Sequence, residues 1–134
     1  RTAGFFSPYG PDNFAMAVER SLREGRIFSA SADAIVSPTF VPEMVKACHD
    51  LVVDGESGVW HLTNDGAVSW LDFGRMIAEA LDLDPGQVQP ASARQLGWHA
   101  TRPAYSVLGS RRGTLLSSLT DAVARHAEVR RAFC

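Results

Sequence analysis

The chain has 134 residues, a formal net charge of −2 and a hydrophobic content of 46%, values that are typical of one globular domain and argue against disorder. No apolar run reaches the roughly 18 residues that a transmembrane helix needs, and two cysteines are too few for a disulfide framework. We therefore expect no membrane partner and a cytoplasmic location. Because the chain begins with Arg1 rather than methionine, we expect a processed chain or a piece of a longer one.

Turn residues and apolar periodicity predict four helices joined by short extended segments, in a single small mixed α/β domain over residues 1–134. In chain order, the expected helices cover residues 12–25, 42–55, 69–83 and 119–133. The expected strands or extended segments cover residues 26–29, 34–40, 59–63 and 105–108. Residues 84–91 are expected to be a polar, proline-containing loop, followed by a short helix at 92–97.

Local chemistry supports several of these helix boundaries. Asp12 or Asn13 can cap the first helix, because a short polar side chain accepts a hydrogen bond from the first free amides. Pro42 suits the first position of the second helix, where its missing N–H has no partner to lose. Ser69 and Asp72 form a capping pair at the start of the third helix.

Apolar stripes predict which helix faces are buried. For the second helix the expected core residues are Met44, Val45, Cys48, Leu51 and Val52. For the third helix they are Leu71, Phe73, Met76, Ile77, Ala80 and Leu81. Pro38 cannot donate to a ladder, so the segment around it is expected at a sheet edge or in a loop.

Several kinds of active site are excluded by the sequence. It has no G-x-G-x-x-G, no phosphate-binding G-x-x-x-x-G-K-[ST] and no Cys-x-x-Cys. The four histidines, including His99, show no i, i+4 metal spacing, so no metal site is expected. No carboxylate pair suited to glycosidase chemistry is evident either, and no catalytic residue is expected. Neighbouring helix residues face different ways, so Cys48 is expected in the core and His49 in solvent. Cys134, the last residue, is expected to fray.

Arginines dominate residues 94–134, where they alternate with Leu, Val and Ala at helical spacing. No series of aromatic residues accompanies them. This pattern favours a solvated helix face, and no nucleic acid is expected as a partner.

Five short motifs follow one another in an order that resembles one enzyme family. They are Arg-Thr-Ala-Gly-Phe-Phe at 1–6 with Asn-Phe at 13–14, Ser-Pro-Thr-Phe-Val-Pro-Glu-Met at 37–44 after Asp33, Gly-Val-Trp-His-Leu-Thr-Asn at 58–64, Ser-Trp-Leu-Asp-Phe-Gly at 69–74, and Arg-Pro-Ala-Tyr-Ser-Val-Leu at 102–108. In this order they resemble dTDP-4-dehydrorhamnose reductases, which are extended short-chain dehydrogenase/reductases. The resemblance covers essentially the whole chain.

The resemblance implies the C-terminal, substrate-binding part of a Rossmann-type α/β fold whose NAD(P)-binding part is absent from this chain. It implies NADPH or NADH as the cofactor of the full-length parent and none on this piece alone. The partner it implies is a dTDP-deoxysugar. The family's catalytic Tyr-x-x-x-Lys cannot occur here, since the sole lysine, Lys46, is preceded four residues back by Pro42. Gly4 stands where the family carries an aromatic residue that lines the sugar site.

By the same resemblance, Thr2 and Ala3 would lie near the nicotinamide edge of the cofactor site. Asn13 would contact the substrate, or would simply cap its helix.

Arg102 would grip the diphosphate, because a guanidinium suits bidentate phosphate contact, or would be an exposed loop arginine. Phe14 or Phe5 would stack on a ring of the substrate, or would pack in the core.

Two functions are open at this point. One is the substrate-binding fragment of a reductase, inactive alone, and the other is a non-catalytic interaction or positioning module. If residues 1–6 belong to the parallel sheet of a longer parent, they would lose their neighbouring strands in this chain and leave an apolar edge, so a homodimer, or an ordered contact, through residues 1–8 is expected.

Overall fold

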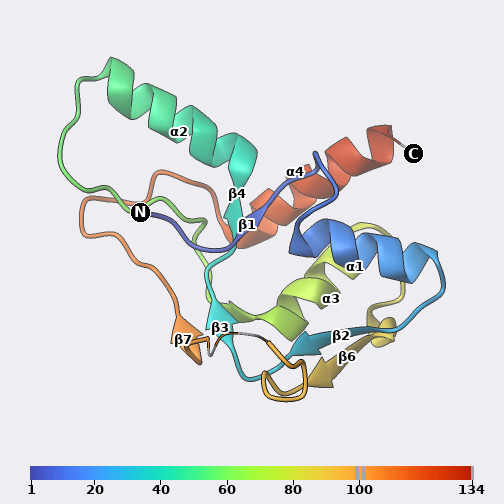
Figure 1. Cartoon of the computed structure of the whole chain (residues 1–134). Coiled ribbons are helices and arrows are strands. Elements are labelled where there is room, and N and C mark those ends of the chain that lie inside the picture. Colours follow the sequence, from blue (N-terminus) through green and yellow to red (C-terminus); the bar gives the residue numbers. More distant parts are fainter. Residues whose placement is uncertain (99, 101, 134) are drawn as a thin grey trace.

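Helices and short strands alternate along the chain in the computed structural model, which describes residues 1–98, 100 and 102–133 (Figure 1). The helices of this described part are α1 (Phe14–Arg23), α2 (Val41–Val53), α3 (Trp70–Ala80) and α4 (Leu119–Ala132), with a 3-10 turn, η1 (Pro85–Gln87). The strands are β1 (Phe5–Phe6), β2 (Phe28–Ser31), β3 (Ile35–Val36), β4 (Thr39–Phe40), β5 (Val68–Ser69), β6 (Val88–Ala91) and β7 (Tyr105–Ser106). The expected mixed α/β fold is confirmed. No helix among the described residues is long and apolar enough to cross a bilayer.

The strands form three small sheets. β1 pairs with β4 and β2 with β6, both in parallel, while β3 lies between antiparallel β5 and parallel β7. The β2–β6 register sets Phe28 opposite Val88. Parallel pairing needs a crossover connection, and the chain between β2 and β6 supplies it.

Four of the expected element positions were wrong. The strand predicted at 26–29 lies two residues later, because its register is set by β6, and β6 itself falls in a stretch predicted to be a loop. The predicted strand at 59–63 is not a regular strand, although its Leu62 amide donates to the Arg1 carbonyl at 2.8 Å. Residues 92–97 form turns rather than a helix.

The main core lies where α1, α3 and α4 meet β1, β2, β4 and β6 (Figure 1). Its least exposed members are Phe6, Ala15, Val18, Phe73, Ile77, Ala78, Val88, Ala122 and Ala127. The predicted capping pair of α3 is confirmed: the Asp72 amide donates to Ser69 Oγ at 3.0 Å, and that hydroxyl donates to the Asp72 carboxylate at 2.7 Å.

α2 buries only part of the face that was predicted, since Met44 and Leu51 of the predicted set do pack inward. Ala47 is buried with Met44 and Leu51 beside it, and this face packs on Leu62 and Leu116 in a second, small cluster. The predicted core residues Val45, Cys48 and Val52 are exposed instead. Figure 1 shows the reason, since α2 stands apart from the other helices and has support along one side only.

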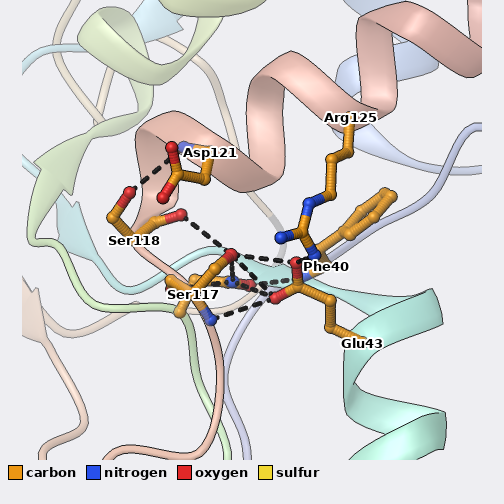
Figure 2. A network of polar contacts seen from close by, with 7 residues as sticks. Phe40, Glu43, Ser117, Ser118, Asp121 and Arg125 are labelled. Atoms are coloured by element: carbon orange, nitrogen blue, oxygen red, sulfur yellow. Dashed lines mark hydrogen bonds and ion pairs between the residues drawn. The ribbon is translucent and has the colours of Figure 1, made fainter.

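A polar cluster ties the start of α2 to the start of α4 (Figure 2). Asn64, which is only 1% exposed, accepts from the Phe40 amide at 2.7 Å and donates to Glu43 at 2.9 Å and to the Ser117 carbonyl at 3.0 Å. The Ser117 hydroxyl donates to the Glu43 carboxylate at 2.9 Å, and Arg125 forms an ion pair with the same carboxylate. Both side-chain polar atoms of Asn64 are therefore satisfied.

A second charged contact joins α1 to α4. Glu19 is 2% exposed and lies 2.8 Å from both Arg23 Nε and Arg130 Nε. Although burial acts to raise it, hydrogen bonds from Arg130 and Arg23 hold the pKa of Glu19 below its usual value.

His126 lies nearby, fully buried against the rings of Phe6 and Phe40. Neither ring nitrogen has a hydrogen-bond partner among the described residues. Burial lowers the pKa of His126 to about 4, opposed by Glu19 and reinforced by Arg130. The imidazole is therefore neutral at pH 7.

We expect this histidine to make the fold sensitive to mild acid. The unfolded chain binds a proton at His126 as the pH falls below about 6.5, whereas the folded chain resists until about pH 4. The free energy of unfolding should fall by about 3 kcal/mol across this window. His126→Leu should remove that loss, measured by urea unfolding at several pH values. The exposed His49→Leu is the control, and an unchanged slope in His126→Leu would contradict the assignment.

Candidate functional site

An aromatic hollow of about 310 Å³ opens between the start of α1, strand β2, the start of α3 and the loop after β6. The side chains that give it its character are Phe14, Phe28, Trp70, Leu96, Trp98 and Arg102. Ser29, Ala30 and Ser31 of β2 complete its wall. Apolar pockets with a few polar groups are the usual form of small-molecule sites.

Phe14 belongs to the core and to this hollow at once. Its ring lies 4.7 Å from the Trp70 ring, meets Phe28 edge-on at 5.5 Å and stacks on Phe73 at 5.5 Å. Such contacts fix the ring plane and leave one part of it open to the hollow. The two roles weighed for Phe14 are therefore compatible.

Arg102 supplies the positive charge of the hollow. Its guanidinium carbon lies 5.3 Å from the centre of the Trp98 ring, a cation–π contact. The side chain is exposed and forms no ion pair within the described part of the chain, so its hydrogen-bond donors are available to an anion.

Asp33 fixes the loop that carries Trp98. The Ser31 hydroxyl donates to this carboxylate at 2.7 Å and the Ala93 amide at 2.9 Å. These two hydrogen bonds, the one from Ser31 first, hold the pKa of Asp33 below its usual value. The carboxylate thus connects the end of β2 to the turns after β6.

Asn13 caps α1. Its side-chain oxygen accepts from the Met16 amide at 3.2 Å, and its Nδ2 donates to the Ser7 carbonyl at 3.1 Å. Asn13 holds the first turn of α1, and with it Phe14, in place at the hollow. It does not itself line the hollow.

The other three predicted site residues are not among those that line the hollow. Thr2 donates to the Thr39 hydroxyl at 3.3 Å, Ala3 is half-buried, and Phe5 is 50% exposed on β1. Gly4 links this segment to the hollow, because a Cβ on it would lie 3.0 Å from Trp70 Cη2.

The sequence did not identify Trp70 and Phe28 as lining residues. Trp70 follows a helix cap and suggests a core residue, and Phe28 falls in a predicted strand with the wrong bounds. Their contact with Phe14 is tertiary, since Phe28 and Trp70 lie far from it in the sequence, and no sequence signal indicated it. The described residues contain no cluster that could hold a metal, and His99 and Cys134 lie outside the described part.

The family model described as "RmlD substrate binding domain" matches residues 1–127. A dTDP-4-keto-6-deoxy-D-glucose reductase of Streptomyces niveus is 32% identical over 81% of this chain and 38% of its own length. A dTDP-4-dehydrorhamnose reductase of Mycolicibacterium smegmatis is 32% identical over 84% of this chain and 35% of its own. The structure of a dTDP-4-dehydrorhamnose reductase of Bacillus anthracis in complex with NADP superposes with a TM-score of 0.86 at 29% identity, covering 94% of this chain and 46% of that one. The chain thus spans less than half the length of these relatives.

Gly4→Ala should displace Trp70, because the new methyl group would approach the ring edge closer than ordinary van der Waals contact. The ring is held by Phe14, so we expect a loss of about 1 kcal/mol in unfolding free energy and a change in tryptophan fluorescence. Gly109→Ala is the matched control, since nothing lies within 4 Å of the position that its new methyl group would take. Equal effects of the two substitutions would show that Trp70 does not need Gly4.

Proposed function

Since this chain belongs to the RmlD substrate binding domain family, we propose that it is the substrate-binding part of a dTDP-4-dehydrorhamnose reductase-like enzyme. In that role it holds a dTDP-deoxysugar in the aromatic hollow. The observation that carries the proposal is that Phe14 and Arg102, separated by most of the sequence, line this one hollow.

The lining suits the two chemically distinct ends of such a ligand. The rings of Phe14, Phe28 and Trp98 offer apolar faces to a pyrimidine base or a deoxysugar. Arg102 offers parallel N–H donors to a diphosphate, and its stacking on Trp98 restricts the side chain before a ligand arrives.

Asn13 acts in this proposal by placing Phe14. A direct bond from its amide to a sugar hydroxyl would use the second Nδ2 hydrogen, which donates to the Gly10 carbonyl at 3.5 Å, while the first stays on the Ser7 carbonyl. Phe5, which is 50% exposed on β1, is proposed as an outer contact of the sugar.

A cofactor is proposed for the full-length protein and not for this chain alone. The NADP-bound relative supports NADPH or NADH as that cofactor. This chain has no Gly-rich phosphate loop and no Tyr-x-x-x-Lys, so its residues do not make a dinucleotide site by themselves. Thr2 and Ala3 are proposed only as contacts at the edge of the nicotinamide.

An interaction module is the second candidate function. It is favoured by the outer face of α2, where Val45 is 56% exposed and Val52 is 78% exposed. Apolar side chains on one exposed helix face suit a contact with another protein surface.

Binding of dTDP or dTDP-rhamnose should separate these two candidates. A ligand at about 100 times its Kd adds about 2.7 kcal/mol to the unfolding free energy, which should raise the Tm by roughly 10 °C. Arg102→Ala should weaken the binding about tenfold, because a charge-assisted contact is lost. Arg20→Ala, an exposed arginine on α1, is the matched control.

Absence of any shift in the unsubstituted chain would favour the interaction module. In both cases we expect no oxidation of NADPH with dTDP-4-keto-6-deoxyglucose by this chain alone. NADPH oxidation by this chain alone would contradict the proposal that the reacting groups belong to a part of the enzyme outside these residues.

We also propose that residues 1–8 mediate a homodimer. One side of this segment pairs with β4 at Phe5–Phe6, and Phe5 leaves half of its ring in solvent. Light scattering should give twice the chain mass, and Phe5→Ser should shift the population towards monomer. A monomer at all concentrations tested would contradict this proposal.

A further inference from the structure

We propose that a second hollow in this chain, of about 490 Å³, is a binding site for a phosphate-bearing anion. It lies between residue 1, the 59–61 segment and the 109–112 loop, and it shares no lining residue with the aromatic hollow. Its charged and titratable lining residues are Arg1, His61, Arg111 and Arg112. No carboxylate is among the lining residues.

Arg112 is fixed before any ligand binds. Its guanidinium carbon lies 3.9 Å from the centre of the Trp60 ring. The same group donates to the Ser57 carbonyl at 2.6 Å and to the Glu56 carboxylate at 3.1 Å. Because Glu56 neutralises part of the positive charge of Arg112, this side chain contributes mainly a fixed surface of the hollow rather than net charge.

The loop that carries these arginines is fastened to the 59–63 segment. His61 Nδ1 donates to the Gly109 carbonyl at 2.7 Å, and the Thr63 hydroxyl donates to the Leu108 carbonyl at 3.2 Å. The Arg112 amide donates to the Ser110 hydroxyl at 3.3 Å. A loop held in this way keeps its positive groups facing one volume, which lowers the ordering cost of binding.

The positive charges of Arg1 and Arg111 are not balanced by an ion pair with any described carboxylate. Their guanidinium groups form no ion pair or hydrogen bond with any other described residue. Two uncompensated cations beside one hollow create a positive potential that attracts anions. Guanidinium groups match the geometry of phosphate oxygens, and Val59 adds an apolar wall that suits the organic part of a phosphate ester.

Titration calorimetry with inorganic phosphate, pyrophosphate and a sugar monophosphate tests this site. Saturable binding is expected for at least one of them, and tighter binding of the sugar monophosphate than of free phosphate would identify an ester as the ligand class. Arg111→Ala should weaken the binding about tenfold. Because its side chain has no partner among the described residues, the Tm of this variant should stay unchanged.

Arg20→Ala is the matched control, and it should leave phosphate binding intact. Arg111→Ala should also leave dTDP binding at the aromatic hollow intact, which separates this site from the proposed function. The proposal is overturned if no probe binds saturably, if Arg20→Ala weakens binding as much as Arg111→Ala does, or if Arg102→Ala abolishes phosphate binding.

Discussion

The buried amide of Asn64 is the contact on which the arrangement of the chain depends. It connects the end of β4, the first turn of α2 and the segment that enters α4, all through hydrogen bonds of 2.7–3.0 Å. In a low-dielectric interior such bonds are stronger than in water, and an unpaired partner is correspondingly costly. Loss of this side chain would remove the acceptor of the Phe40 amide and one of the donors to the Glu43 carboxylate. α2, which has little apolar support of its own, relies on this anchor.

The sequence predicted the elements whose signals are local. α3 carries its own cap at Ser69 and a clear apolar stripe, so its start and its buried face were predicted correctly, although the helix ends at Ala80, before the predicted residue 83. β6 has no such signal, because it is defined by pairing with a strand much earlier in the chain and contains Pro90. α2 has apolar residues on two faces, and periodicity alone does not decide which face meets the second cluster.

For the site, the residue types could be read from the sequence, but their proximity in space depends on the tertiary fold. Phe14 and Arg102 could be named in advance only through resemblance to a family. That they border one hollow depends on the turns after β6, which Asp33 holds in place. The closeness of Gly4 to Trp70 is a tertiary contact with no sequence signature. The second hollow, lined by Arg1, Arg111 and Arg112, could not be predicted from the sequence either, because these arginines come from distant parts of the chain.

The one-sided support of α2 divides the chain into two units of unequal stability. The anchored end of this helix, at Glu43, is tied to α4, whereas Val52 and Val53 at its other end lie largely in solvent. Local opening should therefore begin at the C-terminal end of α2 and travel towards Asn64. The aromatic hollow is built on α1, α3 and β2, which belong to the main core and not to the small cluster under α2, so we expect it to keep its shape when the end of α2 frays.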